Sequence, residues 1–284
     1  MEIHRESRRA RYKIAKYLGY TFAFLSYYSG IIWLYSILRK KLWRRFRIIV
    51  LAYHRVTDDV ENPDMEVSLK DFEWQIKYLK QHYKIVTLNT VVNILRDNGE
   101  TREDCVALTF DDGYVDNFFN VYPTLKKHRL PATFFIVSGL IDRDKDRLTS
   151  DQIIKMKKDG FDFGGHTISH PILAKIGVDK ASEEIIFSKK EIENVLAEKI
   201  RFFAYPKGGK NHYTEDTKSL VKEAGYQAAF TTQIGEIRKE SDLFALNRIV
   251  VNHCPFFVFK ARASGVVENR FVQFILKALK GRMH

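Results

Sequence analysis

The chain has 284 residues, of which 45% are hydrophobic, and its formal net charge at pH 7 is +12. This length and apolar content are enough for a packed core in one large domain or two small ones. Residues 1–47 hold twelve Lys or Arg and two Glu, which leaves 35 basic and 33 acidic residues in the rest of the chain. Because that remainder is nearly neutral, we expect no nucleic-acid partner. The two cysteines, Cys105 and Cys254, form no disulfide framework and no pair spaced for metal or redox chemistry.

Residues 1–47 surround an uncharged run with basic clusters. Residues 17–38 contain no Asp, Glu, Lys or Arg, and Lys and Arg flank the run on both sides. As a helix the run is about 33 Å long, enough for a hydrocarbon core of about 30 Å. Five tyrosines make it only moderately apolar. We expect a membrane-associated segment that binds lipid, either as a single span or as an interfacial anchor, with a hairpin packed on the domain as the third option. Because both flanks are basic, the side of the membrane stays open.

From residue 48 onward, short apolar runs alternate with amphipathic stretches. Ser68 and Thr149 are each followed by a helical pattern, as N-cap residues are. About eight buried strands that alternate with helices predict an α/β fold, a distorted parallel barrel of about seven to eight strands. We therefore predict two regions, residues 1–47 and a domain over residues 48–284. The predicted strands cover residues 48–53, 85–88, 105–110, 132–137, 161–165, 202–205, 227–231 and 246–251.

Two short motifs indicate the chemistry. Asp111 and Asp112 are adjacent and follow the apolar run 105–110, just before a glycine. His166 and His170 are four residues apart, so one turn brings their rings to the same side. One carboxylate and two imidazoles make an open three-ligand site for a divalent metal, and the second carboxylate is left over as a base. This combination predicts metal-assisted hydrolysis.

Residues 48–252 resemble the NodB-homology polysaccharide deacetylases, carbohydrate esterase family 4. Residues 109–114 (Thr-Phe-Asp-Asp-Gly-Tyr) resemble the first motif of the family, and residues 166–170 (His-Thr-Ile-Ser-His) resemble the second. Residues 203–208 (Phe-Ala-Tyr-Pro-Lys-Gly) are similar to the third motif as poly-N-acetylglucosamine deacetylases have it. That subgroup also has a Tyr-His pair on its first strand, which Tyr53 and His54 match. The resemblance implies an enzyme that hydrolyses the acetamide groups of N-acetylated glycans.

The resemblance also implies roles for the two first motifs. Asp112, His166 and His170 become the ligands of one divalent metal, for which Zn²⁺ is the first choice and Co²⁺, Ni²⁺ or Fe²⁺ also suit the ligands. Asp111 becomes the general base that takes a proton from the attacking water. In the third motif, the backbone N–H near Lys207 would help to hold the oxyanion.

The third motif departs from the family's commonest form. Ala204 stands where most members have an arginine that orients the base. Arg248, at the end of another predicted strand, is the best substitute, unless it only caps that strand. Tyr205 and Pro206 would shape the sugar pocket.

The general acid has two candidates. The usual late histidine of the family lacks a clear counterpart, although His253 lies in the right region. His54 is the stronger candidate, because the subgroup with the Tyr-His start supplies its acid from there. The leading hypothesis is an N-deacetylase for N-acetylglucosamine-type units of a polysaccharide or lipid-linked glycan. The same site could also remove O-acetyl groups, and a catalytically idle glycan-binding barrel is a third reading that the intact motifs argue against.

Overall fold

The computed structural model describes residues 17–42, 46–97 and 101–266. The chain divides into two compact units. Unit 1 consists of residues 1–45 together with 254–284, and unit 2 consists of residues 46–253. The proposed division into residues 1–47 and 48–284 stays a prediction.

Unit 2 is built on one parallel sheet whose strands are ordered β10-β1-β5-β6-β7-β8-β9, with β4 paired to β5 outside this path. Parallel strands need crossover connections, and helices supply most of them here. The sheet curls into a half-barrel of seven strands, so the predicted parallel α/β fold is confirmed. The strands are β1 (Ile48–Tyr53), β4 (Lys84–Ile85), β5 (Cys105–Phe110), β6 (Thr133–Ile136), β7 (Asp162–Gly165), β8 (Phe202–Ala204), β9 (Ala228–Phe230) and β10 (Ile249–Val250); β2 (Arg55–Val56) and β3 (Glu66–Val67) form a separate pair.

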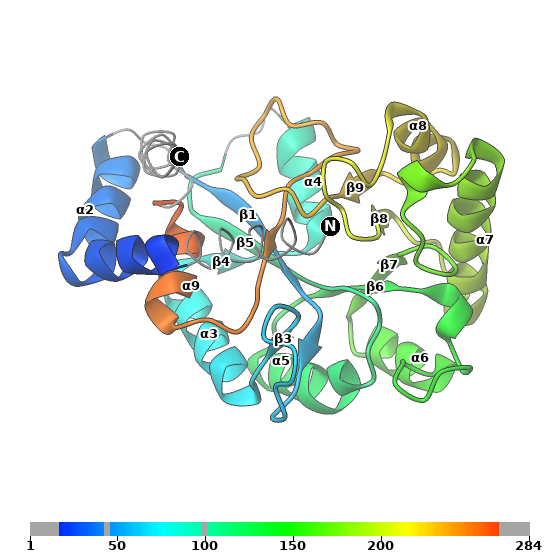
Figure 1. Ribbon diagram of the computed structural model, residues 1–284, viewed down its shortest axis with the longest axis horizontal. Helices are drawn as coiled ribbons and strands as arrows, with labels where there is room; N and C mark the ends of the chain where they lie inside the picture. Colours follow the sequence, from blue (N-terminus) through cyan, green and yellow to red (C-terminus); the bar gives the residue numbers. More distant parts are fainter. Residues whose placement is uncertain (1–16, 43–45, 98–100, 267–284) are drawn as a thin grey trace, which may run out of the picture. The chain divides into compact units, whose positions relative to one another are not determined.

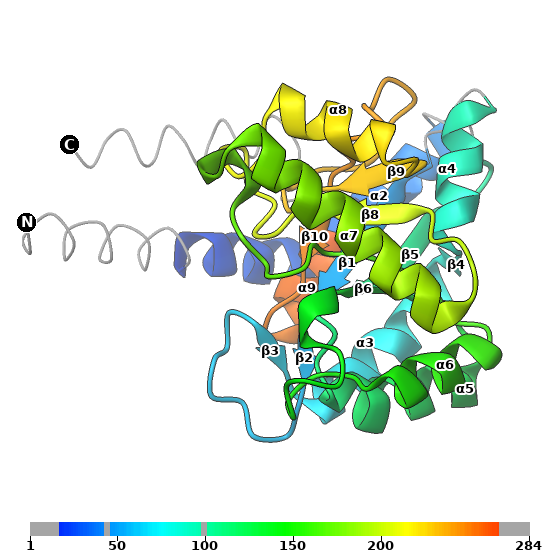
Figure 2. The same ribbon diagram turned by 90° about the vertical axis from the view of Figure 1, so that its right-hand side faces the viewer.

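Helices surround the sheet of unit 2 (Figure 1). Ser68 and Thr149 cap their helices as predicted, since the Ser68 side chain accepts from Asp71 N and Thr149 forms a capping box with Gln152. Figure 2 shows α7 lying beside α8, a contact that also holds in the coordinates. The helices are α3 (Leu69–His82), α4 (Leu88–Arg96), α5 (Tyr122–His128), α6 (Ser150–Lys158), α7 (Val178–Leu196) and α8 (Glu215–Glu223), with the short turns η2 (Asn117–Val121), η3 (Ser138–Leu140) and η4 (Leu173–Lys175).

Strands β1 and β5 form the centre of the core. Every residue of both strands is buried, and their register pairs Tyr53 with Phe110 at the carboxyl ends. The rings of Tyr53, Phe110 and Phe134 stack in succession, with centroids 5.2 and 5.0 Å apart. Because parallel strands end at the same edge, the residues that follow Tyr53 and Phe110 are brought together there.

The segment from Leu246 to the end of β10 contacts β9 at one end of the strand order and β1 near the other. Leu246 N donates to Ala229 O (2.9 Å), and Thr231 N donates to Leu246 O (2.8 Å). Three residues later, Ile249 pairs with Leu51 of β1. The predicted strand 246–251 is therefore only partly regular, and Ile249–Val250 is the part of it that forms a strand.

The described part of unit 1 contains a helix over Tyr17–Tyr28, α2 (Ile31–Ile37), η1 (Leu38–Leu42) and α9 (Phe256–Ser264). Among the described residues, no single helix combines the length and the hydropathy needed to cross a bilayer. Tyr17–Tyr28 and Ile31–Lys41 meet that test only as a pair, which is bent by 69° at its break. Part of the basic flank (residues 1–16 and 43–45) lies outside the described residues. The expected membrane segment stays a prediction.

Candidate active site and metal centre

The two adjacent carboxylates occupy the turn that ends β5. Asp111 still belongs to the ladder, since its N–H donates to Tyr53 O (2.9 Å). Asp112 and Gly113 then have φ values of 70° and 64°, in the left-handed region. A Cβ at Gly113 would lie 2.9 Å from Ile136 Cδ1, so a glycine suits this turn on both counts. A non-glycine residue at positive φ is strained, and strain of this kind concentrates at functional sites.

The two histidines enter the site from the loop after β7. His166 is buried, and its Nδ1 lies 2.7 Å from Ala204 O. A carbonyl oxygen only accepts, so Nδ1 donates this hydrogen bond, and Nε2 is the ring nitrogen left for a ligand. Thr167 and His170 have φ values of 66° and 60°, and His170 N donates to Thr167 Oγ1 (3.0 Å). This tight turn brings the His170 ring back to the His166 ring.

Asp112, His166 and His170 converge on one point. Asp112 Oδ1 lies 3.4 Å from His166 Nε2 and 3.2 Å from His170 Nε2, and the three ligand atoms all lie within 4.8 Å of one another. Asp112 Oδ1 is buried yet accepts no hydrogen bond from the described part of the chain. Burial by itself raises the pKa of Asp112, but the two histidines outweigh it and hold the pKa far below its usual range. A buried, ionised and unsatisfied oxygen beside two imidazole nitrogens suits a divalent cation.

Glu184 of α7 holds the histidine loop in place. Its Oε2 accepts from Ile168 N (2.8 Å) and Ser169 N (2.9 Å), and its Oε1 accepts from Ser169 Oγ (2.6 Å). The carboxylate is buried, and charge-assisted hydrogen bonds of this type are stronger than neutral ones. Glu184 was not predicted as a site residue, because one acidic residue on an amphipathic helix carries no motif.

Arg248 forms a bidentate ion pair with the other carboxylate, that of Asp111. Its Nη1 and Nη2 donate to Asp111 Oδ1 and Oδ2, each at 2.7 Å, while Nε donates to Thr231 O (2.9 Å) and Nη1 to Thr109 Oγ1 (3.0 Å). Arg248 is 0% exposed and Asp111 is 1% exposed. Burial raises the pKa of Asp111, but the charge of Arg248 outweighs it and lowers the pKa below its ordinary value. Asp111 is therefore ionised and held in one orientation, apart from the group of three possible metal ligands.

Known proteins are similar to this chain in sequence and in fold. A family model described as polysaccharide deacetylase matches residues 98–229. A protein of Bacillus subtilis (strain 168) named as a polysaccharide deacetylase, YxkH, is 31% identical over 207 residues, 72% of each chain. The chain belongs to the polysaccharide deacetylase family. It is accordingly a deacetylase, a hydrolase.

Further relatives of the deacetylase have more specific names or solved structures. The poly-beta-1,6-N-acetyl-D-glucosamine N-deacetylase of Staphylococcus aureus (strain MRSA252) is 27% identical over 245 residues, 77% of this chain and 83% of that protein. The structure of IcaB from Ammonifex degensii superposes with a TM-score of 0.69 at 25% identity, covering 77% of this chain and 97% of that one. The Streptococcus pyogenes deacetylase PplD in complex with acetate gives a TM-score of 0.67 at 28% identity, over 73% and 93% of the chains.

His54 of the deacetylase follows β1, beside the carboxylates. The charges of Asp111 and Asp112 raise its pKa, but burial has the larger effect and the pKa lies below its ordinary value. His54 Nδ1 is buried and has no hydrogen-bond partner among the described residues. The ring is therefore neutral near pH 7. His253, the alternative acid, is 47% exposed at its side chain, and its Nδ1 lies 3.2 Å from Asp71 Oδ2. Which histidine acts as the acid stays a prediction.

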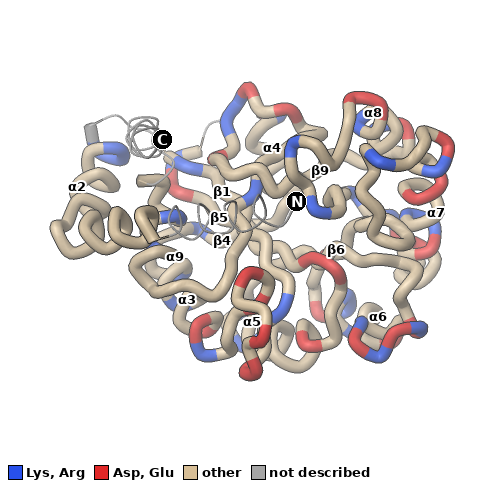
Figure 3. Tube along the Cα trace, viewed as in Figure 1, with Lys and Arg blue, Asp and Glu red and all other residues tan. Residues whose placement is uncertain are grey.

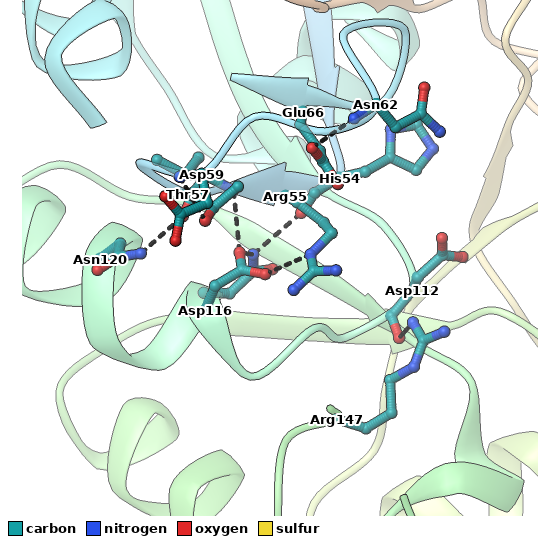
Figure 4. A network of polar contacts seen from close by, with 12 residues as sticks. His54, Arg55, Thr57, Asp59, Asn62, Glu66, Asp112, Asp116, Asn120 and Arg147 are labelled. Atoms are coloured by element: carbon teal, nitrogen blue, oxygen red, sulfur yellow. Dashed lines mark hydrogen bonds and ion pairs between the residues drawn. The ribbon is translucent and has the colours of Figure 1, made fainter. Parts of the chain in front are cut away.

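A polar network holds the strand after His54 (Figure 4). Asp116 accepts from Arg55 Nε and from Val56 N, each at 2.9 Å. Asn117 Nδ2 donates to His54 O (3.0 Å) and to Asp116 Oδ1 (3.0 Å). These bonds hold the backbone from the His54 carbonyl to Val56, the segment that follows the His54 ring.

Arg147 supports the turn that carries Asp112. Its Nη1 donates to Asp112 O (2.9 Å), a contact that Figure 4 shows. Its guanidinium lies 3.9 Å from the ring centroid of Tyr114, and Arg55 lies 4.9 Å from the same centroid. Cation–π contacts of this kind order both partners. Arg147 was not predicted either, since no motif includes it.

The third motif spans the end of β8 and the loop that follows it. Tyr205 is fully buried, and its hydroxyl donates to Phe244 O (2.9 Å), so its side chain can shape a sugar pocket only indirectly. Pro206 is buried and Lys207 is exposed. Lys207 has a φ of 61°, and its carbonyl accepts from Thr232 Oγ1 (2.6 Å). The pocket and oxyanion roles of Tyr205, Pro206 and Lys207 stay predictions.

Proposed function

We propose that this deacetylase removes N-acetyl groups from N-acetylglucosamine-type units of a polysaccharide or lipid-linked glycan. The proposal rests on two adjacent carboxylates with different partners. Asp111 accepts two hydrogen bonds from Arg248, whereas Asp112 lies beside the imidazoles of His166 and His170. Hydrolysis of an acetamide needs a base for the water and an electrophile for the carbonyl, and the two carboxylates fit these separate tasks. The similarity to a poly-beta-1,6-N-acetyl-D-glucosamine N-deacetylase supports the choice of sugar.

We propose one divalent metal for this site, held by Asp112 and by the Nε2 atoms of His166 and His170. Zn²⁺ is the first choice, because one carboxylate and two neutral imidazoles are ligands that it prefers, and Co²⁺, Ni²⁺ or Fe²⁺ suit the same set. When bound there, such an ion polarises an acetyl carbonyl and lowers the pKa of a water molecule. The bond from His166 Nδ1 to Ala204 O leaves Nε2 as the atom that faces the metal position.

The remaining groups handle protons and orientation. Asp111 takes a proton from the attacking water. Arg248 keeps the Asp111 carboxylate ionised and holds it in one orientation. In its protonated form, His54 would donate a proton to the leaving amine nitrogen, because an amine leaves poorly without one. The backbone N–H of Lys207 would donate to the oxyanion.

Acetate release tests the proposal directly. The full chain, supplied with Zn²⁺ or Co²⁺, should release acetate from a β-1,6-linked N-acetylglucosamine oligomer, and Asp111→Asn should lose about 10²- to 10⁴-fold in kcat. An acetylated xylan serves as the comparison substrate. Faster release from the xylan than from the oligomer would favour the O-acetyl esterase alternative. If no acetate is released from either substrate or from a wider panel of acetylated glycans, the alternative of a catalytically idle glycan-binding barrel would be favoured.

We also propose that residues 1–47 bring the enzyme to a membrane. Support comes from the uncharged run 17–38 and its basic flanks. Washing isolated membranes with high salt or carbonate extracts a surface-bound protein and leaves a spanning one, and recovery of the full chain in the soluble fraction before any wash contradicts the proposal.

A further inference from the structure

Arg55 directly follows the proposed acid His54 and is held by a buried carboxylate. Its Nε donates to Asp116 Oδ2 (2.9 Å), and the Asp116 side chain is only 9% exposed. Asp116 Oδ1 accepts from Val56 N (2.9 Å) and from Asn117 Nδ2 (3.0 Å), so hydrogen bonds on both oxygens hold the carboxylate in one orientation. Because a guanidinium is planar and rigid, fixing Nε also orients the rest of the group.

The other end of the Arg55 guanidinium is available to a ligand. Nη1 and Nη2 donate no hydrogen bond to any residue in the described part of the chain. The side chain is 32% exposed, so these two nitrogens reach solvent while Nε stays beside buried Asp116. Most N–H donors of a guanidinium belong to its terminal nitrogens. Arg55 therefore presents several donors in a fixed direction to a molecule that binds beside it.

The free end of Arg55 lies beside the catalytic centre. Its guanidinium carbon is 4.9 Å from the ring centroid of Tyr114, which follows the proposed metal ligand Asp112 after one glycine. Arg147 lies 3.9 Å from the same centroid and donates to Asp112 O (2.9 Å). In Figure 4 the guanidinium of Arg55 points from its strand toward the side where Asp112 and Arg147 lie. We therefore expect a sugar ring to come within reach of Arg55 when its acetamide group is at the catalytic centre.

The charges around Arg55 indicate which kind of acceptor suits it. Burial lowers the pKa of Arg55, but the hydrogen bond and charge of Asp116 and the charge of Glu66 outweigh burial and raise it. The loop over residues 57–65, which follows β2, adds four acidic residues and no basic one (Figure 3). Since negative charge exceeds positive charge here, the local field does not attract an anion. Neutral oxygens, such as those of sugar hydroxyls, accept hydrogen bonds from a guanidinium without needing a positive field.

We propose that Arg55 is a substrate-binding residue whose Nη1 and Nη2 atoms donate hydrogen bonds to hydroxyl oxygens of the sugar that carries the acetamide group. The inference rests on the proposed N-deacetylase function and deepens it, because it names a residue that selects a sugar over a small acetyl compound. Asp116 is a positioning residue, since it orients the guanidinium without touching the substrate. The contact forms only with a hydroxylated substrate, so Arg55 acts on substrate binding.

Kinetics of the full chain on two substrates test the role of Arg55. The substrates are a soluble β-1,6-linked N-acetylglucosamine oligomer and an aryl acetate, which has an acetyl group but no sugar. Arg55→Met removes the donors at similar length, and Arg55→Lys keeps the charge without the planar group. The matched control is Arg143→Met, since Arg143 is an exposed arginine between β6 and α6 whose Nη1 donates to Gly139 O (3.1 Å).

Arg55→Met should raise KM for the oligomer and lower kcat/KM about 10- to 100-fold, the usual worth of hydrogen bonds from a charged donor. Its kcat should change much less, because the ground state and the transition state lose the same contact. The ratio of oligomer hydrolysis to aryl acetate hydrolysis should fall by the same factor as kcat/KM. Arg55→Lys should recover only part of the loss, and Arg143→Met should match the parent. Parental metal content in all three variants would show that the site is folded.

Deoxy oligomers and Asp116 identify the contact more closely. In each deoxy oligomer, hydrogen replaces one hydroxyl of the unit that loses acetate. At least one of them should be a poorer substrate than the complete oligomer for the parent but not for Arg55→Met, which has no donor to lose. Asp116→Asn places an amide N–H opposite Arg55 Nε and should therefore raise KM as well. The double variant should be no worse than Arg55→Met alone.

Each of three results would contradict the role of Arg55. Equal losses on the oligomer and on the aryl acetate would make Arg55 a structural partner of Asp116. Parental kinetics of Arg55→Met on the oligomer would remove Arg55 from substrate binding. A preference of the parent for glycans that carry a carboxylate or phosphate group, lost in Arg55→Met, would assign the guanidinium to an anion instead of hydroxyls. If the parent hydrolyses the aryl acetate but no N-acetylated oligomer, the proposed function fails, and the inference fails with it.

Discussion

Replacing Arg248 by methionine should separate positioning from metal binding at this site. Methionine has a similar length and no charge, so the change removes four hydrogen bonds of the guanidinium and leaves Asp111 buried without its partner. Breaking a buried ion pair from one side typically costs about 3–5 kcal/mol of unfolding free energy. Since the total stability of a domain is about 5–15 kcal/mol, the variant should fold but unfold at a clearly lower denaturant concentration.

Arg248→Met should also lower kcat strongly, beyond what its loss of stability would cause. Without Arg248 the Asp111 carboxylate is no longer aimed, and general-base assistance is worth about 10²- to 10⁴-fold in rate. Arg248→Lys should recover only part of this, because an ammonium group cannot make the bidentate contact. The metal content should stay at the level of the parent, since Arg248 contacts none of the three proposed ligands.

The pH dependence follows from the two opposed effects on Asp111. In the parent, burial raises its pKa and the charge of Arg248 outweighs burial, so the pKa lies below the ordinary value of 3.8. Removing Arg248 leaves burial in control, so the pKa rises and the acid limb of kcat/KM moves to higher pH. The stability that the parent gains from this lowered pKa is present above pH 3.8 and is lost as pH falls through the folded value. The stability gap between parent and variant should therefore begin to shrink as pH falls through the raised pKa of Asp111 in the variant, and it should go on shrinking as the parent loses its own contribution below pH 3.8.

A double-mutant cycle that combines Arg248→Met with Asp111→Asn tests whether Arg248 acts only by positioning Asp111 or has a separate role in catalysis. If Arg248 acts only through Asp111, the double variant should be no slower than Asp111→Asn alone. Unfolding in urea, acetate release and metal analysis on the same four proteins supply the data. Additive losses in kcat, or an Arg248→Met protein with parental turnover and an unmoved acid limb, would refute the reasoning.

Other predictions concern the metal, the acid and the loop. Asp112→Ala and His166→Ala should each lose the bound metal on purification, and parental metal content in both would rule out the site. His54→Gln should slow N-deacetylation far more than hydrolysis of an aryl acetate, whose leaving group needs no proton; equal losses would indicate a structural role. Glu184→Gln, whose amide group presents N–H donors to the loop, should weaken metal affinity about 10- to 100-fold, while Glu183→Gln on the exposed side of α7 should not.

Local patterns determined most of the secondary structure and the two first motifs. Strands β1 and β5 begin and end at the predicted residues, because unbroken apolar runs of six residues are typical of strands buried on both faces. The predicted strand 85–88 is partly wrong. Only Lys84–Ile85 is strand, since Thr87 caps helix α4 by accepting from Thr90 N (3.1 Å), and a cap takes the chain out of the ladder.

Tertiary structure alone decided how those motifs are held. The sequence indicated Arg248 as a substitute for the missing arginine, but the bidentate contact joins residues 137 positions apart, which no local pattern encodes. Glu184 looks like any acidic residue on a helix until the loop after β7 folds against it. The association of α9 with the N-terminal helix was likewise invisible, because aromatic residues near both ends predict burial or exposure without naming a partner. The motifs are visible in the sequence because their catalytic side chains lie within a few residues of one another. The contacts that orient these side chains join residues far apart in the sequence, so they are known only from the folded structure.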